Sequence, residues 1–214
     1  MNTQVQLKTR RQLRTRGTRR RIVTVKLNTE ASVAILSPIY AALPITRAAG
    51  EYNLAYTEVE WPTLKSIGDY LDNTTWAAGS NKFYDLGCGR GRAVLYMVLA
   101  GPFEMSIGIE VLPERIRLAQ QALTVLKSSI PMSSSKVHLY EASFLNQAFK
   151  YKDARVIFLS NESFDNETQS ALFSKLNIEM PKDSLLFCSK EPIPIPGAFD
   201  KVGKIAEIHI LKHL

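Results

Sequence analysis

The stretch that decides the fold is residues 83–92, which read Phe-Tyr-Asp-Leu-Gly-Cys-Gly-Arg-Gly-Arg. It follows a short apolar run and precedes the apolar segment RAVLYMVLA, which reads as a buried helix. A strand, a glycine-rich turn and a helix form a nucleotide-binding unit, because glycines let the backbone turn tightly and approach a ligand closely. The amides at the start of the helix then face that ligand.

The spacing of Gly87, Gly89 and Gly91 argues against a phosphate ligand. The dinucleotide fingerprint is G-x-G-x-x-G, whereas the third glycine here comes one residue early, and no G-K-[ST] sequence follows. Asp85 stands just before the turn, where a carboxylate would repel a pyrophosphate and suit an amine or a sulfonium. The pattern D-x-G-x-G-x-G resembles motif I of the class I methyltransferases, and this resemblance implies S-adenosylmethionine (SAM) as the cofactor.

A second acid supports a nucleoside ligand. Glu110 ends the strand-like segment 105–111 and follows Gly91 by 19 residues. An acid at the end of the second strand of a βαβ unit can bond both ribose hydroxyls of a nucleoside. Pro113 suits the first turn of the helix that follows.

The rest of the chain alternates between strand and helix patterns. Strands are expected at 22–27, 82–86, 105–111, 136–142, 154–160, 183–189 and 204–212, and helices at 61–71, 90–100, 113–128 and 166–176. Residues 31–49 are helix-compatible but broken by Pro38 and Pro44. This alternation predicts a doubly wound, mostly parallel, Rossmann-like α/β sheet with an N-terminal helical and loop segment. We expect a basic tail at 1–29, a helical and loop cap segment at 30–81, and a SAM-binding core at 82–214.

Composition excludes several classes of protein. The 214 residues suit one domain, and no apolar run has the length of a membrane span, so no membrane insertion is expected. Two cysteines make no disulfide framework, and three histidines without a C-x-x-C pair predict no metal site.

The net charge of +7 is concentrated at the N-terminus. Residues 1–29 carry nine basic side chains and no acid, whereas the remainder carries 18 basic and 20 acidic ones. Such a tail is expected to be disordered on its own. Residues 8–26 suit binding to nucleic acid or a nucleosome through phosphates, a mitochondrial transit peptide, or a plain soluble arm.

Three further segments narrow the class of methyltransferase. They read Tyr-Thr-Glu-Val-Glu-Trp at 56–61, Val-Ile-Phe-Leu-Ser-Asn-Glu-Ser-Phe at 156–164, and Phe-Cys-Ser-Lys at 187–190. Together with motif I, they resemble the non-SET histone lysine methyltransferases of the disruptor-of-telomeric-silencing type. The resemblance spans roughly residues 52–192 and implies a nuclear enzyme that methylates a lysine of a histone or nucleosome.

The resemblance also implies roles for individual residues. Glu58, Asp85 and Gly87 would face the methionine end of SAM, and Gly89 and Gly91 would complete the turn beneath it. Glu110 would bind the ribose, and Ser143 and Phe144 would flank the adenine. The expected catalytic group comprises Tyr56, Ser160, Asn161 and Phe164, with Phe164 in the wall of the lysine channel.

This chain departs from the family pattern at several positions. Ser160 replaces the first residue of an Asn-Asn pair, Ser143 replaces an acid, and only about one strand fits after Pro196 where the family has an antiparallel pair. Three alternatives therefore stay open. They are a mitochondrial protein-lysine methyltransferase, a nucleic-acid methyltransferase, and an inactive methyltransferase-fold protein that binds nucleic acid through its tail. The patterns are silent on oligomeric state.

Overall fold

The computed structural model describes residues 26–45, 58–75, 81–130, 136–191 and 195–214. The helices are α1 (Thr29–Ala41), α2 (Trp61–Asp72), α3 (Arg92–Ala100), α4 (Pro113–Ser129) and α5 (Asn166–Glu179). The strands are β1 (Lys82–Leu86), β2 (Met105–Glu110), β3 (Val137–Glu141), β4 (Ala154–Leu159), β5 (Leu185–Cys188), β6 (Phe199–Ile205) and β7 (Ile208–His213).

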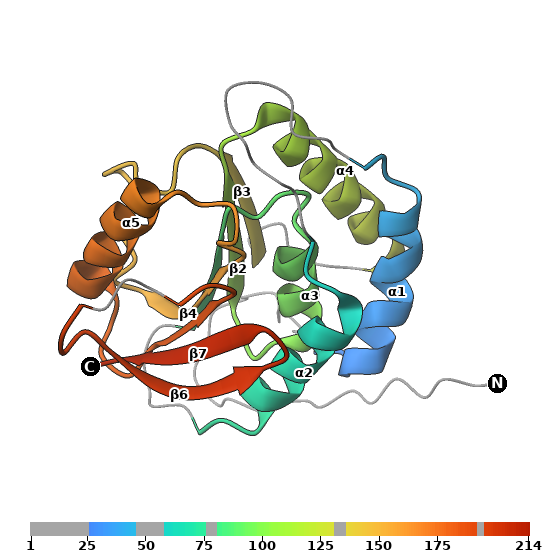
Figure 1. Ribbon diagram of the computed structural model, residues 1–214. Helices are drawn as coiled ribbons and strands as arrows, with labels where there is room; N and C mark the ends of the chain where they lie inside the picture. The colour runs from blue at the N-terminus through green and yellow to red at the C-terminus, as the bar shows by residue number, and fades with distance from the viewer. Residues whose placement is uncertain (1–25, 46–57, 76–80, 131–135, 192–194) are drawn as a thin grey trace, which may run out of the picture.

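The strands form a seven-stranded sheet in the order β3-β2-β1-β4-β5-β7-β6 (Figure 1). The first five are parallel, and β1 lies between β2 and β4, with Tyr84 opposite Ile107 on one side and Ile157 on the other. The predicted mostly parallel Rossmann-like fold is confirmed. The strand order reverses between β1 and β4, and ligands of such sheets bind in the crevice beyond the strand ends at that point.

The two faces of the sheet are covered unequally. Helices α1 to α4 pack on one face and α5 packs on the other (Figure 1). Helix α3 lies in the middle of the larger layer, where α1 and α2 pack over it, so all its residues from Ala93 to Ala100 are buried. An apolar helix enclosed in this way holds the glycine-rich turn before it in one place.

The C-terminus corrects one expectation. A single strand at 204–212 was predicted, whereas the structure has the antiparallel hairpin β6–β7 beside β5. The two residues between these strands include Ala206 at φ 49°, a left-handed conformation that usually favours glycine or asparagine. The turn therefore carries no recognisable turn sequence. Strand β6 is also largely exposed, so no apolar run marks it.

The N-terminal segment differs from expectation in two ways. Helix α1 runs through Pro38 without a break, and Asn28 caps it by accepting a hydrogen bond from the amide of Ala31 at 2.7 Å. Of the strand expected at 22–27, only Lys26 and Leu27 are described, and neither lies in a strand. Of the basic stretch 8–26, all residues but Lys26 lie outside the described residues.

Candidate functional site

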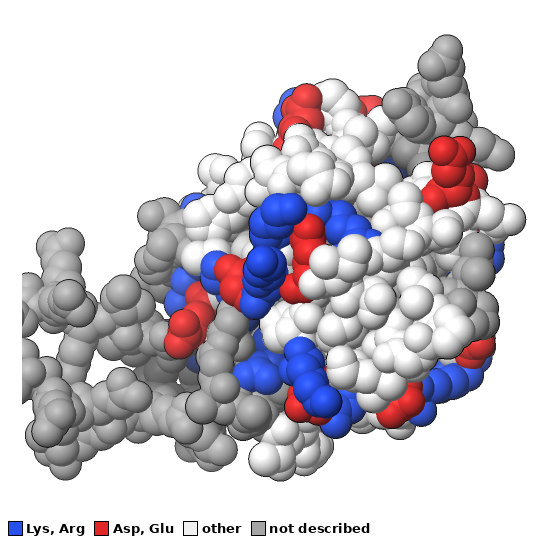
Figure 2. Space-filling view, turned by 90° about the vertical axis from the view of Figure 1, so that its left-hand side faces the viewer, with Lys and Arg blue, Asp and Glu red and all other residues white. Residues whose placement is uncertain are grey.

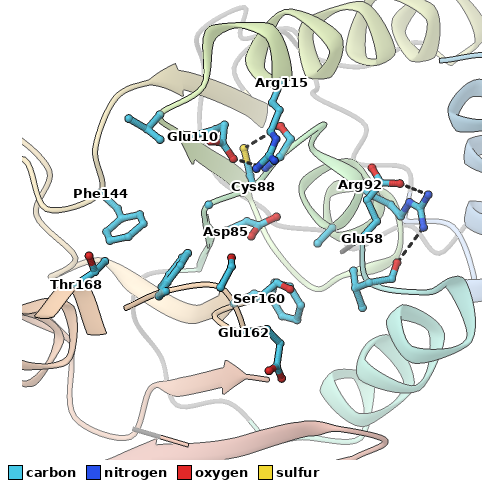
Figure 3. Close-up of a pocket in the computed structure, with 18 of the residues that line it drawn as sticks. Glu58, Asp85, Cys88, Arg92, Glu110, Arg115, Phe144, Ser160, Glu162 and Thr168 are labelled. Carbon is cyan, nitrogen blue, oxygen red and sulfur yellow. Dashed lines mark hydrogen bonds and ion pairs between the residues drawn. The ribbon is translucent and has the colours of Figure 1, made fainter. Parts of the chain in front are cut away.

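A pocket of about 390 Å³ lies at the carboxyl ends of the parallel strands (Figure 3). Asp85 reaches it from β1, Glu110 from the end of β2, and Ser160 from just beyond β4. The volume falls in the usual range of small-molecule sites. Its lining also includes Glu58, Val59, Gly87, Cys88, Gly89, Arg92, Ala93, Val111, Arg115, Ser143, Phe144, Leu145, Phe158, Glu162, Ser163, Phe164, Asp165 and Thr168.

The glycine-rich turn forms the floor of this pocket. Its backbone is held against β2, since the amides of Gly87 and Cys88 donate to the carbonyl of Ile109 at 2.8 and 3.1 Å. Gly87 has φ +83°, and a Cβ there would lie 3.2 Å from Cζ of Phe164. The absence of a side chain therefore lets an aromatic ring approach the turn directly.

Glu110 joins β2 to the turn. It is buried, and its Oε2 accepts a hydrogen bond from the amide of Gly89 at 2.9 Å while its Oε1 accepts from Leu112 at 3.0 Å. Each carboxylate oxygen has a second lone pair, so both can still accept from the hydroxyls of a ribose. The structure thus places Glu110, the residue predicted to bind the ribose, in the pocket lining.

Asp85 is the feature that fits a cationic ligand. Its side chain is 3% exposed, yet no hydrogen bond to its carboxylate is found among the described residues. Burial raises the pKa of Asp85 well above its usual range, and the nearby charge of Glu110 raises it further. A buried carboxylate without a partner is costly unless a cation completes it. The ammonium and sulfonium groups of SAM have the required charge.

Glu58 lies in the pocket wall but is engaged by two arginines from the turn. Its Oε1 accepts from Nε of Arg90 at 2.8 Å, and its Oε2 pairs with Nη2 of both Arg90 and Arg92. Arg90 also donates through Nη1 to the carbonyls of Leu43 and Pro44, beyond the end of α1. The cluster of Glu58, Arg90 and Arg92, here called the arginine clamp, therefore ties the N-terminal helices to the turn.

Aromatic rings surround the clamp on its outer side. The guanidinium of Arg92 lies 4.8 Å from the ring centre of Trp61 and 5.5 Å from that of Tyr40. The hydroxyl of Tyr40 donates to the carbonyl of Arg90 at 3.1 Å. Cation–π contacts of this kind are stronger where water is excluded, so they reinforce the clamp. Trp61 thus packs against the clamp through Arg92.

The expected adenine region contains an aromatic pair. The ring centres of Phe144 and Phe164 are 5.2 Å apart and the rings are tilted by 33°. Ser143 is exposed beside them, and its hydroxyl accepts from the amide of Leu145 at 3.2 Å. Its hydroxyl proton remains available to a ring nitrogen.

The four residues expected to be catalytic have different positions. Ser160 and Phe164 line the pocket, whereas Tyr56 lies outside the described residues. Asn161 is fully buried and is not part of the pocket lining. Its amide donates to Gln169 at 3.0 Å and to the carbonyl of Lys190 at 2.9 Å, and its oxygen accepts from the amide of Lys190 at 2.9 Å. It joins the turns after β4 and β5.

Several pocket residues were not anticipated from the sequence. Arg92 and Arg115 begin α3 and α4, and both reach the lining from helix starts. Glu162 and Asp165 follow β4 in the same segment as Ser160. Their positions just after strand ends are the signal in the sequence that could have identified them, because ligands of such sheets bind beyond the strand ends.

Two further features concern metal binding and membrane crossing. Among the residues that the structure describes, no group of three or more His, Cys, Asp or Glu side chains is arranged to hold a metal ion. None of the described helices is both long enough and apolar enough to cross a bilayer.

Comparison with known families gives a match over most of the chain. The family described as histone methylation protein DOT1 matches residues 50–194. This range contains Glu58, the glycine-rich turn, Glu110 and the segment after β4. No curated protein sequence matches the chain significantly.

Solved structures share the fold. An RNA methyltransferase from Salinibacter ruber, in complex with S-adenosyl-L-homocysteine, is 15% identical with a TM-score of 0.51, over 73% of this chain and 92% of that one. The yhhF protein of Escherichia coli, assigned as a methyltransferase, is 13% identical with a TM-score of 0.52, over 71% and 84%. At these identities the likeness shows the fold alone, and that fold is the one of SAM-dependent methyltransferases.

Proposed function

Since the chain belongs to the family of DOT1 histone methylation proteins, we propose that it is a SAM-dependent protein-lysine N-methyltransferase that acts on a histone or nucleosome. The main support for SAM as the cofactor is the carboxylate of Asp85, which is buried at the pocket floor and has no hydrogen-bond partner among the described residues. The family match supports a histone or nucleosome as the substrate. A nucleosome substrate places the protein in the nucleus.

The pocket residues divide the cofactor among them. Asp85 and Gly87 hold the charged methionine end, and the turn through Gly89 and Gly91 lies beneath it. Glu110 accepts from the ribose hydroxyls. Each of these groups is fixed by strand β1, strand β2 or the start of α3, so little reorganisation is needed on binding.

Three further residues complete the cofactor site. Ser143 and Phe144 flank the adenine, with Ser143 donating its hydroxyl proton. Glu58 faces the methionine end together with Arg90 and Arg92, which hold both its oxygens. The arginine clamp thus orients Glu58 and also places positive charge near the cofactor carboxylate.

When bound, SAM supplies a methyl carbon already activated by a positively charged sulfur, which keeps the electron pair when a nucleophile displaces it. The protein must therefore align the nucleophile and exclude water. Phe164, and Tyr56 from the N-terminal segment, wall the channel for the lysine side chain. Their apolar surfaces disfavour the charged amine and so lower its pKa, and its proton passes to water. Ser160 and Asn161 belong to the turn that borders this channel.

A nucleic-acid substrate is the second candidate, and the acid-free basic stretch 8–26 favours it. Lys and Arg side chains there would bind phosphates. On the face of the molecule that carries α5, basic and acidic side chains are mixed and leave a broad uncharged area (Figure 2). The mitochondrial lysine methyltransferase and the inactive binding protein are the remaining alternatives.

Calorimetric titration with SAM and transfer of a labelled methyl group test the proposal together. We expect SAM binding and labelling of nucleosomes or histones, with both lost in Asp85→Ala and Glu110→Ala. Labelling of RNA or of a mitochondrial extract alone would select another candidate. Binding without labelling of any substrate would identify an inactive protein. Deletion of residues 1–21 should weaken nucleosome binding and flatten its salt dependence.

A further inference from the structure

Five carboxylates line the pocket, and four of them are already engaged or buried. Glu58 is held by the arginine clamp, and Glu110 accepts from two backbone amides. Asp165 caps α5, since its Oδ1 accepts from the amide of Thr168 at 2.7 Å. Asp85 is buried beside Glu110 on the pocket floor. Of these four, Glu58, Asp85 and Glu110 are largely or fully buried. Both oxygens of the exposed Asp165 already accept hydrogen bonds from Thr168.

Glu162 is different from the other four. It is exposed, and no hydrogen bond or ion pair to its side chain is found within the described part of the chain. It lies beyond Ser160, at the end of the pocket opposite Glu110, with its carboxylate directed outward (Figure 3). It therefore places an uncompensated negative charge at the pocket rim.

The backbone that carries Glu162 is held firmly. The buried side chain of Asn161 bonds to Lys190 and Gln169, and Gln169 donates to the carbonyl of Phe164 at 3.1 Å. The amide of Phe164 in turn donates to the carbonyl of Asn161 at 3.2 Å. The turn 160–164 is closed by these bonds, so the rim charge has a defined position.

The surroundings of Glu162 combine charge with apolar surface. Phe158 and Phe164 belong to the same lining, and the ring of Phe164 approaches the glycine-rich turn at Gly87. A flexible chain that ends in an ammonium has the matching properties, because its methylene groups suit the aromatic rings and its charge suits the carboxylate. A neutral hydroxyl or a phosphate does not match.

We propose that Glu162 is the specificity residue that recognises the protonated amine of the substrate at the mouth of the pocket. This inference rests on the proposed function, because it assumes that the pocket methylates an amine. Glu162 takes part in binding and not in bond making. A carboxylate beside an ammonium stabilises the charged form, so Glu162 lowers the KM for the cationic substrate at the mouth, before the amine passes into the aromatic channel and loses its proton.

The test uses the full chain saturated with S-adenosyl-L-homocysteine and two small probes. n-Butylammonium imitates the end of a lysine side chain, and n-butanol is its neutral counterpart. Their affinities are measured by ligand-observed NMR for the wild type, Glu162→Gln and Glu167→Gln. Glu167 is the matched control, since it is an exposed acid in the same segment outside the pocket lining.

The wild type should bind n-butylammonium more tightly than n-butanol. Glu162→Gln should weaken n-butylammonium by about two- to fivefold, the range expected of an exposed ion pair, and leave n-butanol unchanged. Glu167→Gln should change neither. With nucleosomes as substrate, Glu162→Gln should raise KM and leave kcat nearly unchanged, because the contact is made on entry and not at the reacting atoms.

Unchanged n-butylammonium binding in Glu162→Gln, with cofactor-product binding intact, would overturn this inference and leave the proposed function standing. Equal binding of the two probes by the wild type would overturn it in the same way. Failure of the wild type to bind S-adenosyl-L-homocysteine at all would remove the proposed function and this inference together.

Discussion

At the scale of single residues, Asp85 carries the clearest consequence for pH dependence. Burial and Glu110 raise the pKa of Asp85 above its value in the unfolded chain. The folded protein therefore holds a proton there that the unfolded chain has lost. Asp85 therefore contributes fully to the stability of the fold below its pKa in the unfolded chain. This contribution is lost as the pH rises through the pKa of Asp85 in the folded protein.

Asp85→Asn removes this loss because asparagine does not ionise. The Tm of the variant should exceed that of the wild type by a margin that grows as the pH rises above about 4, the ordinary pKa of an aspartate, with about 2–4 °C for each kcal/mol. SAM binding should weaken by roughly tenfold or more, because a charge-assisted contact is lost. Equal Tm values for both proteins at pH 8 would contradict the burial of an ionisable Asp85.

Gly91 and Gly197 form a matched pair for the packing of the turn. Both have left-handed φ angles, +78° and +75°, but a Cβ at Gly91 would lie 3.1 Å from Cβ of Ala119, and one at Gly197 meets nothing within 4 Å. Alanine at either position costs about 1–2 kcal/mol of backbone strain. Gly91→Ala should cost about 1–3 kcal/mol more from overpacking against α4, measured by urea unfolding. Equal losses of unfolding free energy in the two variants would mean that α4 shifts to accommodate the methyl group added by Gly91→Ala.

At the scale of elements, the arginine clamp holds α1 and the start of α2 on the glycine-rich turn. Arg90 is 4% exposed and bonds to Glu58, Leu43 and Pro44. Arg90→Ala should lower the free energy of unfolding by about 3–5 kcal/mol, because Oε1 of Glu58 and the carbonyls of Leu43 and Pro44 all lose the hydrogen bonds that Arg90 donates, although Arg92 still pairs with Oε2 of Glu58. Faster hydrogen exchange in α1 should accompany it.

The matched control for the clamp is Arg117→Ala, on the exposed side of α4. An exposed substitution away from special features should change stability by less than about 0.5 kcal/mol. A similar small effect for Arg90→Ala would show that the clamp is not needed to hold α1.

Asn161 and Ser160 are neighbours with separable roles. Asn161→Ala should cost about 1–3 kcal/mol for each backbone group of Lys190 left unpaired, because the turns after β4 and β5 both depend on it. Ser160→Ala should leave stability unchanged and reduce methyl transfer. Chemical denaturation and turnover measured on both variants separate the two effects, and a stable Asn161→Ala would refute the structural role.

At the scale of the whole molecule, cofactor product should stabilise the fold, because its site is built from β1, β2, α3 and the segment after β4. At about 100 times its Kd, S-adenosyl-L-homocysteine should add about 2.7 kcal/mol to the free energy of unfolding. For a chain of this size this corresponds to a Tm rise of roughly 5–11 °C in a thermal shift assay. Adenosine diphosphate serves as the control and should have a smaller effect, because its phosphates offer no hydrogen-bond donor to Asp85, whereas the ammonium group of S-adenosyl-L-homocysteine does.

Much of the fold was predictable because its signals are local. The strand, the glycine-rich turn and the apolar helix at 82–100 are encoded within one continuous stretch, and the parallel strands β1 to β5 each carry their own apolar run. The hairpin β6–β7 could not be predicted, because β6 is exposed and shows no apolar run. In addition, Ala206 has a left-handed turn conformation that alanine rarely adopts. Pro38 was read as a break because proline lowers helix propensity, which packing on α3 and α4 overrides.

Sequence alone is enough to recognise the class I methyltransferase fold, the early third glycine and the acids at the ends of β1 and β2, because each depends on neighbours along the chain. Which charged side chains contact one another depends on the tertiary structure. Glu58 is 32 residues from Arg90 and contacts it, whereas Glu162 shares the pocket lining with Arg92 and Arg115 and forms no ion pair with a described residue. A carboxylate acts on a substrate only when no cation already neutralises it, and that depends on packing between distant segments.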